Sequence, residues 1–272
     1  MIEVRWLGAA GLEISVDGTV ILIDPYLSRP GKFSVLCRKL RPSQARIQSY
    51  TSRVSGKVSA VICGHTHFDH ALDIPDIVSR VHCRVIGSRS LKTLFEISGM
   101  SPEMEICTGN ESFELEGGIK VGMIPSRHGL VLFGKVPYQG EIDPRAEAPL
   151  KANQYCLGDM FMPKIEIGEV TLVHAGSAGF IEPEVRGHKC HILFMCVPGW
   201  KRVPDYTAKF VQMLEPEVII PFHFDDFTVP IRPTGKVRAL PFTDLKGFIE
   251  RLRRYAPGAV VRIPNPAEIM RF

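Results

Sequence analysis

Three histidines and an aspartate fall within one short stretch of the sequence, GHTHFDH at positions 64–70, although the whole chain has only nine histidines. In an extended segment, residues two apart point to the same side, so His65 and His67 could bind one metal ion together, which a helix would not allow. Imidazole nitrogens and carboxylate oxygens are good ligands for zinc, manganese and iron. The alternative is a polar turn whose histidines only cap the next helix, and composition together with context disfavours it.

The residues on either side indicate how this motif is presented. VSAVIC, 58–63, is an apolar run typical of a buried strand. ALDIPDIVSRV, 71–81, predicts a short helix interrupted near Pro75. The motif is then the turn between them, with Asp69 and His70 in the bend that starts the helix. Because a catalytic metal site needs three protein ligands and an open position, further ligands must come from elsewhere in the chain.

The remaining elements alternate loosely between strands and helices. Residues 2–24 form two apolar runs around Asp17-Gly18, which predicts a hairpin. Residues 26–57 lose this pattern and are expected to be irregular or partly helical. Residues 134–153 carry three prolines and no apolar period, so we expect a long loop of a kind that is often functional. Amphipathic patterns predict helices that begin after the capping residues Ser90, Asp205 and Thr243.

Composition limits the class of protein. With 272 residues, 45% of them hydrophobic, the chain can build a substantial core, and we expect one domain over 1–272. The net charge of +4 is mild and scattered, so nucleic acid is not an expected partner. The first residues fit neither a signal peptide nor a membrane span, which favours a cytoplasmic location. Seven cysteines without a CxxC pair indicate buried thiols rather than a disulfide framework.

The order of several motifs resembles the metallo-β-lactamase superfamily of metal-dependent hydrolases. The resemblance runs from about residue 2 to about residue 228, and its motifs are LGAAGLEI, ILIDPYL, GHTHFDH, PSRHG, HAGS and IIPFHFD. It implies an α/β fold, the αββα four-layer sandwich, with one or two metal ions at one edge of the sheets. Within the superfamily, the chain looks most similar to the branch of ascorbate-6-phosphate lactonase and N-acyl-phosphatidylethanolamine phospholipase D.

The resemblance also implies a set of metal ligands. His65 and His67 would bind a first ion with His128, and Asp69 would bind a second ion with His70 and His223. His128 and His223 each follow a predicted strand, as convergence at a sheet edge requires. The expected cofactor is zinc, as one or two ions, with manganese or iron as alternatives.

One position departs from the family pattern. Where the family has an aspartate that bridges both metal ions, this sequence has Ser177 in HAGSAG. A neutral hydroxyl does not offset the repulsion between two cations, so we expect the second ion to be weaker or absent. Asp159 is the alternative bridging residue. We expect His174 to be a supporting or core residue, and His188, Cys190 and His191 to be structural rather than a separate metal cluster.

The implied activity is hydrolysis by a metal-activated water, with Asp69 as the residue that orients the water and passes its proton onward. The bond is an ester, lactone, amide or phosphodiester of a small molecule. Basic residues that could face an anionic substrate are Arg127, Lys151 and Lys201, besides Lys135 and Arg202. A binding or regulatory protein that lost turnover at Ser177 is the alternative function, and a homo-oligomer is compatible with the sequence.

Overall fold

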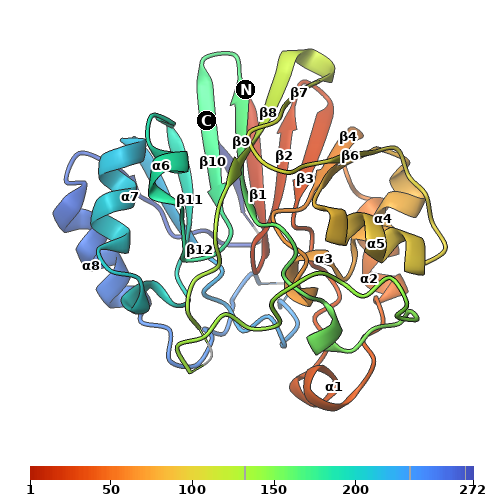
Figure 1. Ribbon diagram of the computed structural model, residues 1–272. Helices are drawn as coiled ribbons and strands as arrows, with labels where there is room; N and C mark the ends of the chain where they lie inside the picture. The colour runs from red at the N-terminus through yellow and green to blue at the C-terminus, as the bar shows by residue number, and fades with distance from the viewer. Residues whose placement is uncertain (132, 233, 267) are drawn as a thin grey trace.

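Two β-sheets packed face to face organise the chain. The structure is a computed structural model, and it describes residues 1–131, 133–232, 234–266 and 268–272. Each sheet has seven strands, and helices lie on the outer side of each sheet (Figure 1). This is the αββα arrangement that the resemblance implied.

The first sheet has the strand order β14-β1-β2-β3-β4-β5-β6. Its strands β1 to β3 form an antiparallel meander, and β3 to β6 are parallel neighbours. Parallel strands place their carboxyl ends at one edge, so the residues after β3 and β4 emerge side by side. The bounds are β1 (Ile2–Gly8), β2 (Gly11–Val16), β3 (Thr19–Ile23), β4 (Lys57–Ile62), β5 (Arg84–Gly87), β6 (Met104–Ile106) and β14 (Ile269–Arg271).

The second sheet has the order β13-β12-β11-β10-β9-β8-β7. Strands β10, β11, β12 and β13 are parallel, and β7, β8 and β9 join them in antiparallel pairs. The bounds are β7 (Ser112–Leu115), β8 (Ile119–Pro125), β9 (Phe161–Ile167), β10 (Val170–Ala175), β11 (Ile192–Cys196), β12 (Val218–Phe222) and β13 (Val260–Val261).

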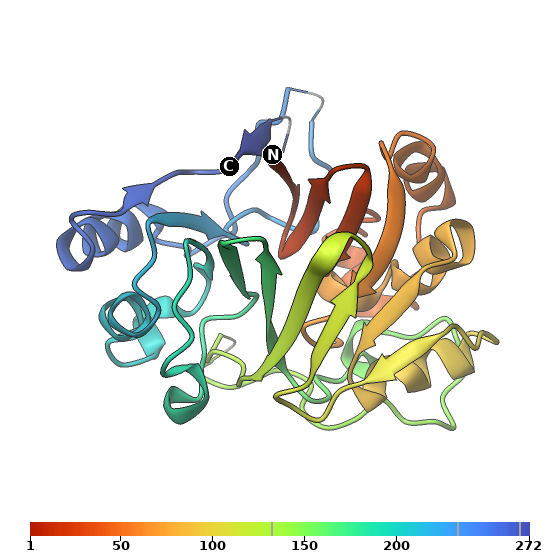
Figure 2. The same ribbon diagram turned by 90° about the horizontal axis from the view of Figure 1, so that it is seen from above.

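The helices cover the outer faces, as the view from above shows (Figure 2). Helices α2, α4 and α5 lie against the first sheet, and α7 and α8 lie against the second (Figure 1). No helix in the described residues is long and apolar enough to cross a membrane. The bounds are α1 (Lys32–Cys37), α2 (Gln44–Thr51), α3 (Phe68–Ala71), α4 (Ile74–Val81), α5 (Arg89–Ile97), α6 (Glu182–Val185), α7 (Tyr206–Leu214) and α8 (Leu245–Tyr255), with short 3-10 turns at Glu116–Gly118, Ala152–Gln154 and Trp200–Arg202.

Strand β3 shows why the central strands are apolar throughout. Ile21 and Ile23 belong to the core between the two sheets. Val20 and Leu22 point the other way, into the core between the first sheet and its helices. Side chains alternate along a strand, so a strand covered on both faces needs apolar residues at every position. The buried strands predicted from such runs are confirmed.

The predicted hairpin at Asp17-Gly18 is confirmed, because both residues have positive φ, 47° and 82°, and join β2 to β3. The stretch before it contains a second turn, at 9–10, which divides the first run into β1 and β2. Pro75 does not interrupt a helix, since it lies in the first turn of α4, where proline lacks no hydrogen bond.

Two of the predicted caps were wrong by one or two residues. The side chain of Ser88, not that of Ser90, caps α5, and Asp244 rather than Thr243 caps α8. The Ser90 hydroxyl instead donates to Glu141 and accepts from the backbone of Ile142, both in the long loop. Asp205 does precede α7, but its side chain makes no capping hydrogen bond.

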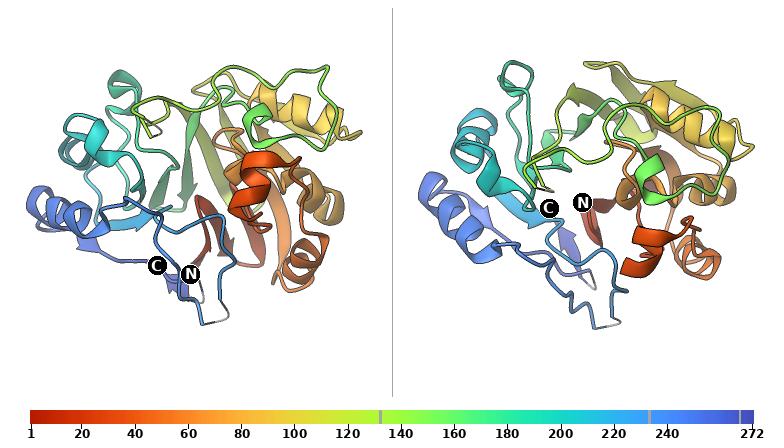
Figure 3. Two further views of the ribbon diagram at one scale, coloured as in Figure 1. Left: turned by 90° about the horizontal axis from the view of Figure 1, so that it is seen from below. Right: turned by 60° about the horizontal axis from the view of Figure 1, so that its bottom comes forward.

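Several connections gather at one edge of the two sheets, at the bottom of Figure 1. Figure 3 shows this side from below: α1 and the long connections from β8 to β9 and from β12 to α8 lie around the ends of the strands. The residues that follow β4, β8 and β12 therefore meet here.

Candidate metal centre

Six side chains from three distant parts of the chain form two compact groups at this edge. His65, His67 and His128 form the first, and Asp69, His70 and His223 form the second. Within each group, one potential ligand atom per residue lies within 4.8 Å of the others. The structure thus brings together all six residues that the resemblance placed at metal ions.

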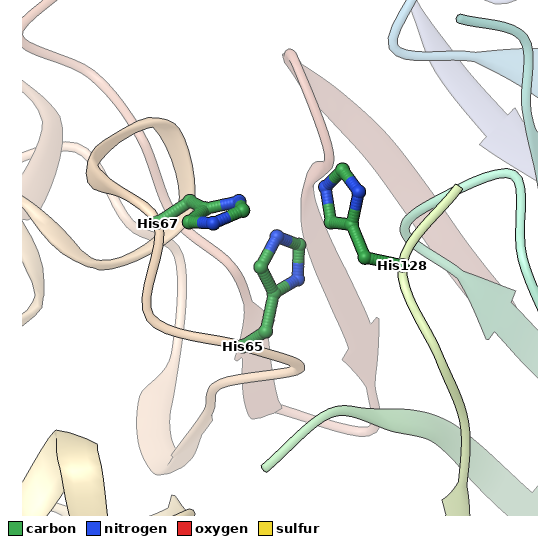
Figure 4. A group of neighbouring side chains, drawn as sticks. All are labelled: His65, His67 and His128. Atoms are coloured by element: carbon green, nitrogen blue, oxygen red, sulfur yellow. The ribbon is translucent and has the colours of Figure 1, made fainter. Parts of the chain in front are cut away.

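The three rings of the first group face a common point (Figure 4). Their centroids are 4.8 Å apart for His65–His67, 5.1 Å for His65–His128 and 4.8 Å for His67–His128. The ring planes are steeply inclined to one another, at 69° to 82°, so the rings do not stack. This is an arrangement in which three nitrogens can approach one ion.

Hydrogen bonds select which nitrogen of each ring is free. His67 donates from Nε2 to the carbonyl of Pro137 at 3.1 Å, because a carbonyl can only accept. His128 donates from Nδ1 to the carbonyl of Gly129 at 2.7 Å. The free nitrogens are therefore Nδ1 of His67 and Nε2 of His128. A backbone carbonyl that fixes the tautomer of a metal-binding histidine is a common second partner in such sites.

His65 provides the test of whether a metal ion fits here. The residue is 1% exposed, and neither of its ring nitrogens has a hydrogen-bond partner among the described residues. A buried polar group without a partner costs about 1–3 kcal/mol, and such groups in a native protein need an explanation. A cation bound by His65, His67 and His128 supplies the missing partner, so the donor set fits a divalent metal ion.

The second group is also buried. Nε2 of His223 lies 3.4 Å from a carboxylate oxygen of Asp69, and the rings of His70 and His223 are 5.3 Å apart. His223 follows β12 and has a positive φ of 62°, which turns its side chain back toward the motif. Its Nδ1 has no partner in the described part of the chain. A carboxylate and two imidazoles form a second donor set of mixed type.

Asp24 supports this group, although it was not among the site residues expected from the sequence. It is fully buried at the end of β3, and it accepts hydrogen bonds from Nδ1 of His70 at 2.8 Å and from the backbone N–H of Gly64 at 2.7 Å. Nδ1 of His70 is thereby occupied, and Nε2 is left for a metal. The signal was present in ILIDP, where a carboxylate ends a buried strand beside the strand that leads into the motif.

The electrostatics keep the first group uncharged. Burial, reinforced by the neighbouring histidines, lowers the pKa of His65 well below its usual value. Burial is also the main cause that lowers the pKa of His67 to about 4 and that of His128 to about 3. Metals bind the neutral imidazole, so these rings are ready to bind metal at neutral pH.

The electrostatics of the second group shift the pKa values of Asp69 and His70 in opposite directions. Burial acts to raise the pKa of Asp69, but the hydrogen bond from His223 and the nearby histidines outweigh it and lower the pKa. Burial acts to lower the pKa of His70, but Asp24 outweighs it and raises the pKa.

Ser177 lies after β10 and is buried, 3% exposed. Its Oγ accepts a hydrogen bond from the backbone N–H of Gly129 at 3.1 Å. Asp159, the alternative bridging residue, belongs to neither donor group. Burial and the charge of Glu141 raise the pKa of Asp159, while Arg89 lowers it. The charged neighbours of Asp159 are therefore Glu141 and Arg89, neither of which belongs to the two donor groups.

His174 and His191 make structural contacts. His174 donates from Nε2 to the carbonyl of Ala10 at 2.7 Å, and its ring packs on Phe222. His191 accepts the backbone N–H of Thr171 through Nδ1. His188, Cys190 and His191 form no metal-ligand group among the residues described.

The basic residues considered for substrate binding are all exposed. Arg127 directly precedes His128. Lys201 pairs with Asp244 at 2.5 Å and lies over the ring of Trp200. Lys151, in the loop 134–153, forms an isolated antiparallel β-bridge with the backbone of Lys39.

The long loop, 134–153, contacts the motif directly. Besides the hydrogen bond that His67 donates to the carbonyl of Pro137, the ring of Tyr138 lies 6.1 Å from that of His67. The segment that follows the loop is tied to Thr66, whose backbone N–H donates to the carbonyl of Leu157. The loop is therefore one wall of the metal centre.

A buried ion pair holds the turn that carries His223. Arg29 lies 2.5 Å from the carboxylate of Asp225, which also accepts the backbone N–H of Ala9 at 2.9 Å. Both charged side chains are at most 2% exposed. Gly8 is required beside them, because its φ is 87° and a Cβ there would lie 1.8 Å from the guanidinium.

Comparisons with known proteins agree with this geometry. The family model described as the β-lactamase superfamily domain matches residues 19–224. A UPF0173 metal-dependent hydrolase from Hyperthermus butylicus is 24% identical, with 99% of each chain covered. Another from Methanopyrus kandleri is 23% identical and covers 83% of this chain and 85% of its own.

Solved structures share the fold. Igni18, a metallo hydrolase from Ignicoccus hospitalis, superposes with a TM-score of 0.63 at 17% identity, over 99% of this chain and 97% of its own. An isothiocyanate hydrolase from Delia radicum gut bacteria gives 0.62 at 17% identity, over 99% of both chains. The matched family model covers most of the chain, including His65, His67 and His128, and the relatives are hydrolases: this chain belongs to the β-lactamase superfamily, as a metal-dependent hydrolase of the metallo-β-lactamase fold.

Proposed function

We propose that the protein hydrolyses an ester, lactone or phosphodiester bond of a small anionic molecule at a metal ion held by His65, His67 and His128. The observation that carries this proposal is the convergence of three neutral rings, those of His65 and His67 buried and that of His128 half-buried, with no other partner for the ring nitrogens of His65. A divalent ion bound there would lower the pKa of a coordinated water toward 7 and polarise the bond that is cleaved.

The protein's own residues supply orientation and proton transfer. Pro137 and Gly129 hold the rings of His67 and His128 through their backbone carbonyls. Asp69 is adjacent in sequence to the histidines of the motif, and its lowered pKa keeps it an acceptor at neutral pH. We assign it to orienting the nucleophilic water and accepting its proton.

The second group would bind a second ion more weakly. Its donors are Asp69, His70 and His223, of which only Asp69 carries a negative charge to offset a cation. Ser177 adds no charge. Zinc is the metal we expect first, because imidazole and carboxylate ligands in a three-residue set suit it, and manganese and iron are alternatives.

An anionic substrate is supported by Arg127, which is exposed and precedes His128 in the chain. Lys201 supports it less, since Asp244 already neutralises that ammonium group. We also propose that the chain is most similar to the branch of ascorbate-6-phosphate lactonase and N-acyl-phosphatidylethanolamine phospholipase D. The substrates tested below distinguish a lactonase from a phosphodiesterase.

The test begins with elemental analysis of purified protein, followed by hydrolysis of bis-p-nitrophenyl phosphate, p-nitrophenyl esters and a set of lactones. We expect at least one metal ion per chain and turnover on one class. His67→Ala should lose both metal and activity, whereas His188→Ala, a histidine outside both groups, should keep both. Stoichiometric metal without turnover on any class would instead support the alternative, a binding protein of the same fold whose departure at Ser177 removed catalysis.

A further inference from the structure

The hydroxyl of Ser177 is connected to the ring of His128 through two consecutive hydrogen bonds. Ser177 Oγ accepts the backbone N–H of Gly129 at 3.1 Å. The carbonyl of the same Gly129 accepts Nδ1–H of His128 at 2.7 Å. The serine therefore holds the residue that determines which nitrogen of His128 is free.

The backbone around these bonds is packed too closely for side chains. A Cβ at Gly129 would lie 2.7 Å from the carbonyl oxygen of Ala178, and one at Gly179 would lie 2.3 Å from that of Arg127. Ser126 adds a further bond across this contact, from its Oγ to the carbonyl of Gly179 at 3.3 Å. The segments 126–129 and 177–179 thus lie in direct contact, and Ser177 is the point at which a side chain reaches the peptide next to His128.

The bond from Gly129 to Ser177 matters because its donor is buried. If the hydroxyl were removed, this N–H would lack an acceptor, at a cost of about 1–3 kcal/mol. Glycine is the residue that rotates most freely about its backbone bonds, so the peptide could turn to find another acceptor. The N–H and the carbonyl of Gly129 belong to successive peptides joined at its Cα, so a rotation about the N–Cα bond changes the direction of one relative to the other. We therefore expect the ring of His128 to lose the group that fixes its tautomer.

We propose that Ser177 is a positioning residue for His128, and that it acts on the first metal site rather than bridging two ions. This inference rests on the proposed function, because it concerns the support of the three-histidine site. It means that the position where the superfamily has a bridging carboxylate serves here to hold one ligand of the first ion. Its effect is transmitted through Gly129, so Ser177 needs no contact with the metal.

The test compares Ser177→Ala with Ser126→Ala. Both changes remove one buried hydroxyl from the same contact, but only the first hydroxyl touches Gly129. Metal-free protein is titrated with up to one equivalent of Co²⁺ in the presence of a competing chelator, and the visible absorption of bound Co²⁺ is recorded. Thermal unfolding of each metal-free variant measures any general loss of packing.

For Ser177→Ala we expect the affinity for Co²⁺ to fall about tenfold, the scale of lost outer partners of metal ligands, with an altered Co²⁺ spectrum. For Ser126→Ala we expect an affinity and a spectrum like those of the wild type. An unchanged affinity and spectrum in Ser177→Ala would overturn the inference. Equal losses in both variants would overturn it too, because general packing would then explain them. If the wild type itself binds no Co²⁺, the proposed function fails, and the inference fails with it.

Discussion

Replacing Asp24 by asparagine should separate metal binding from folding. Asp24 accepts hydrogen bonds from two buried donors, Nδ1–H of His70 and the N–H of Gly64. Asparagine has one carbonyl oxygen for these two donors, and its other group is an NH₂ that can only donate. With the oxygen toward Gly64, the NH₂ faces Nδ1 of His70, and that nitrogen must accept. The ring proton then sits on Nε2, the nitrogen that the metal needs.

The expected magnitudes follow from these contacts. A disturbed outer partner lowers metal affinity about 10–100-fold, which corresponds to about 1.4–2.7 kcal/mol. The fold itself should lose little in Asp24→Asn, because both donors can still be satisfied after the tautomer changes. Asp24→Ala leaves both donors without an acceptor, at about 1–3 kcal/mol each, so the free energy of unfolding of the metal-free protein should fall by about 2–6 kcal/mol.

The assay is a Co²⁺ titration with a competing chelator, followed to the second equivalent, together with urea denaturation of the metal-free protein. The control is Asp73→Asn, because Asp73 is equally buried but accepts hydrogen bonds from Leu27 and Ser28 instead of a histidine. It should lose stability and keep metal affinity. If Asp24→Asn binds the second equivalent as tightly as the wild type does, Asp24 does not set the tautomer of His70, and the reasoning is refuted.

Three further predictions concern charge. Below its ordinary pKa of 6.5, His67 takes up a proton in the unfolded chain but not in the native one, where burial lowers the pKa to about 4. The metal-free protein should therefore lose about 3 kcal/mol of stability from this residue as the pH falls from 6.5 to 4, with no such effect above 6.5. Urea denaturation across this range should show that the free energy of unfolding of His67→Gln changes less with pH than that of the wild type. Equal changes in both proteins would contradict the lowered pKa of His67. Ser177→Asp should raise the metal content toward two ions per chain, because a carboxylate adds a negative charge that offsets the repulsion between two cations. Elemental analysis would show an unchanged count if another residue already bridges. Asp225→Asn leaves the Arg29 guanidinium buried without its counter-charge, so the free energy of unfolding measured with urea should fall by about 3–5 kcal/mol. The control Glu215→Gln, in an exposed ion pair with Lys189, should lose less than about 1 kcal/mol. Similar small losses in both variants would argue against a structural role for the buried pair.

Local features of the sequence predicted most of the elements but not their exact ends. Apolar runs identified strands such as β3 and β4 because a strand buried on both faces leaves no polar position. The sequence predicts Ser90 as the cap of α5, whereas Ser88 is the cap and Ser90 lies in the first turn, because two serines stand at the start of the helical pattern and the local pattern does not choose between them. The tertiary structure distinguishes the two serines, because the hydroxyl of Ser90 is hydrogen-bonded to Glu141 and to the backbone N–H of Ile142 in the long loop.

The sequence by itself predicted the donor residues of the candidate metal centre. The alternate spacing of His65 and His67 after a buried strand puts both on one side of an extended segment, and the resemblance to the superfamily predicted His128 and His223 as further ligands. Only the tertiary structure decided what each ring does, because the groups that hold the rings are backbone carbonyls and a distant carboxylate: Pro137 for His67, Gly129 and Ser177 for His128, and Asp24 for His70. A carbonyl is present at every residue and so leaves no mark in the sequence. Its direction is set by the packing of segments far apart in the chain.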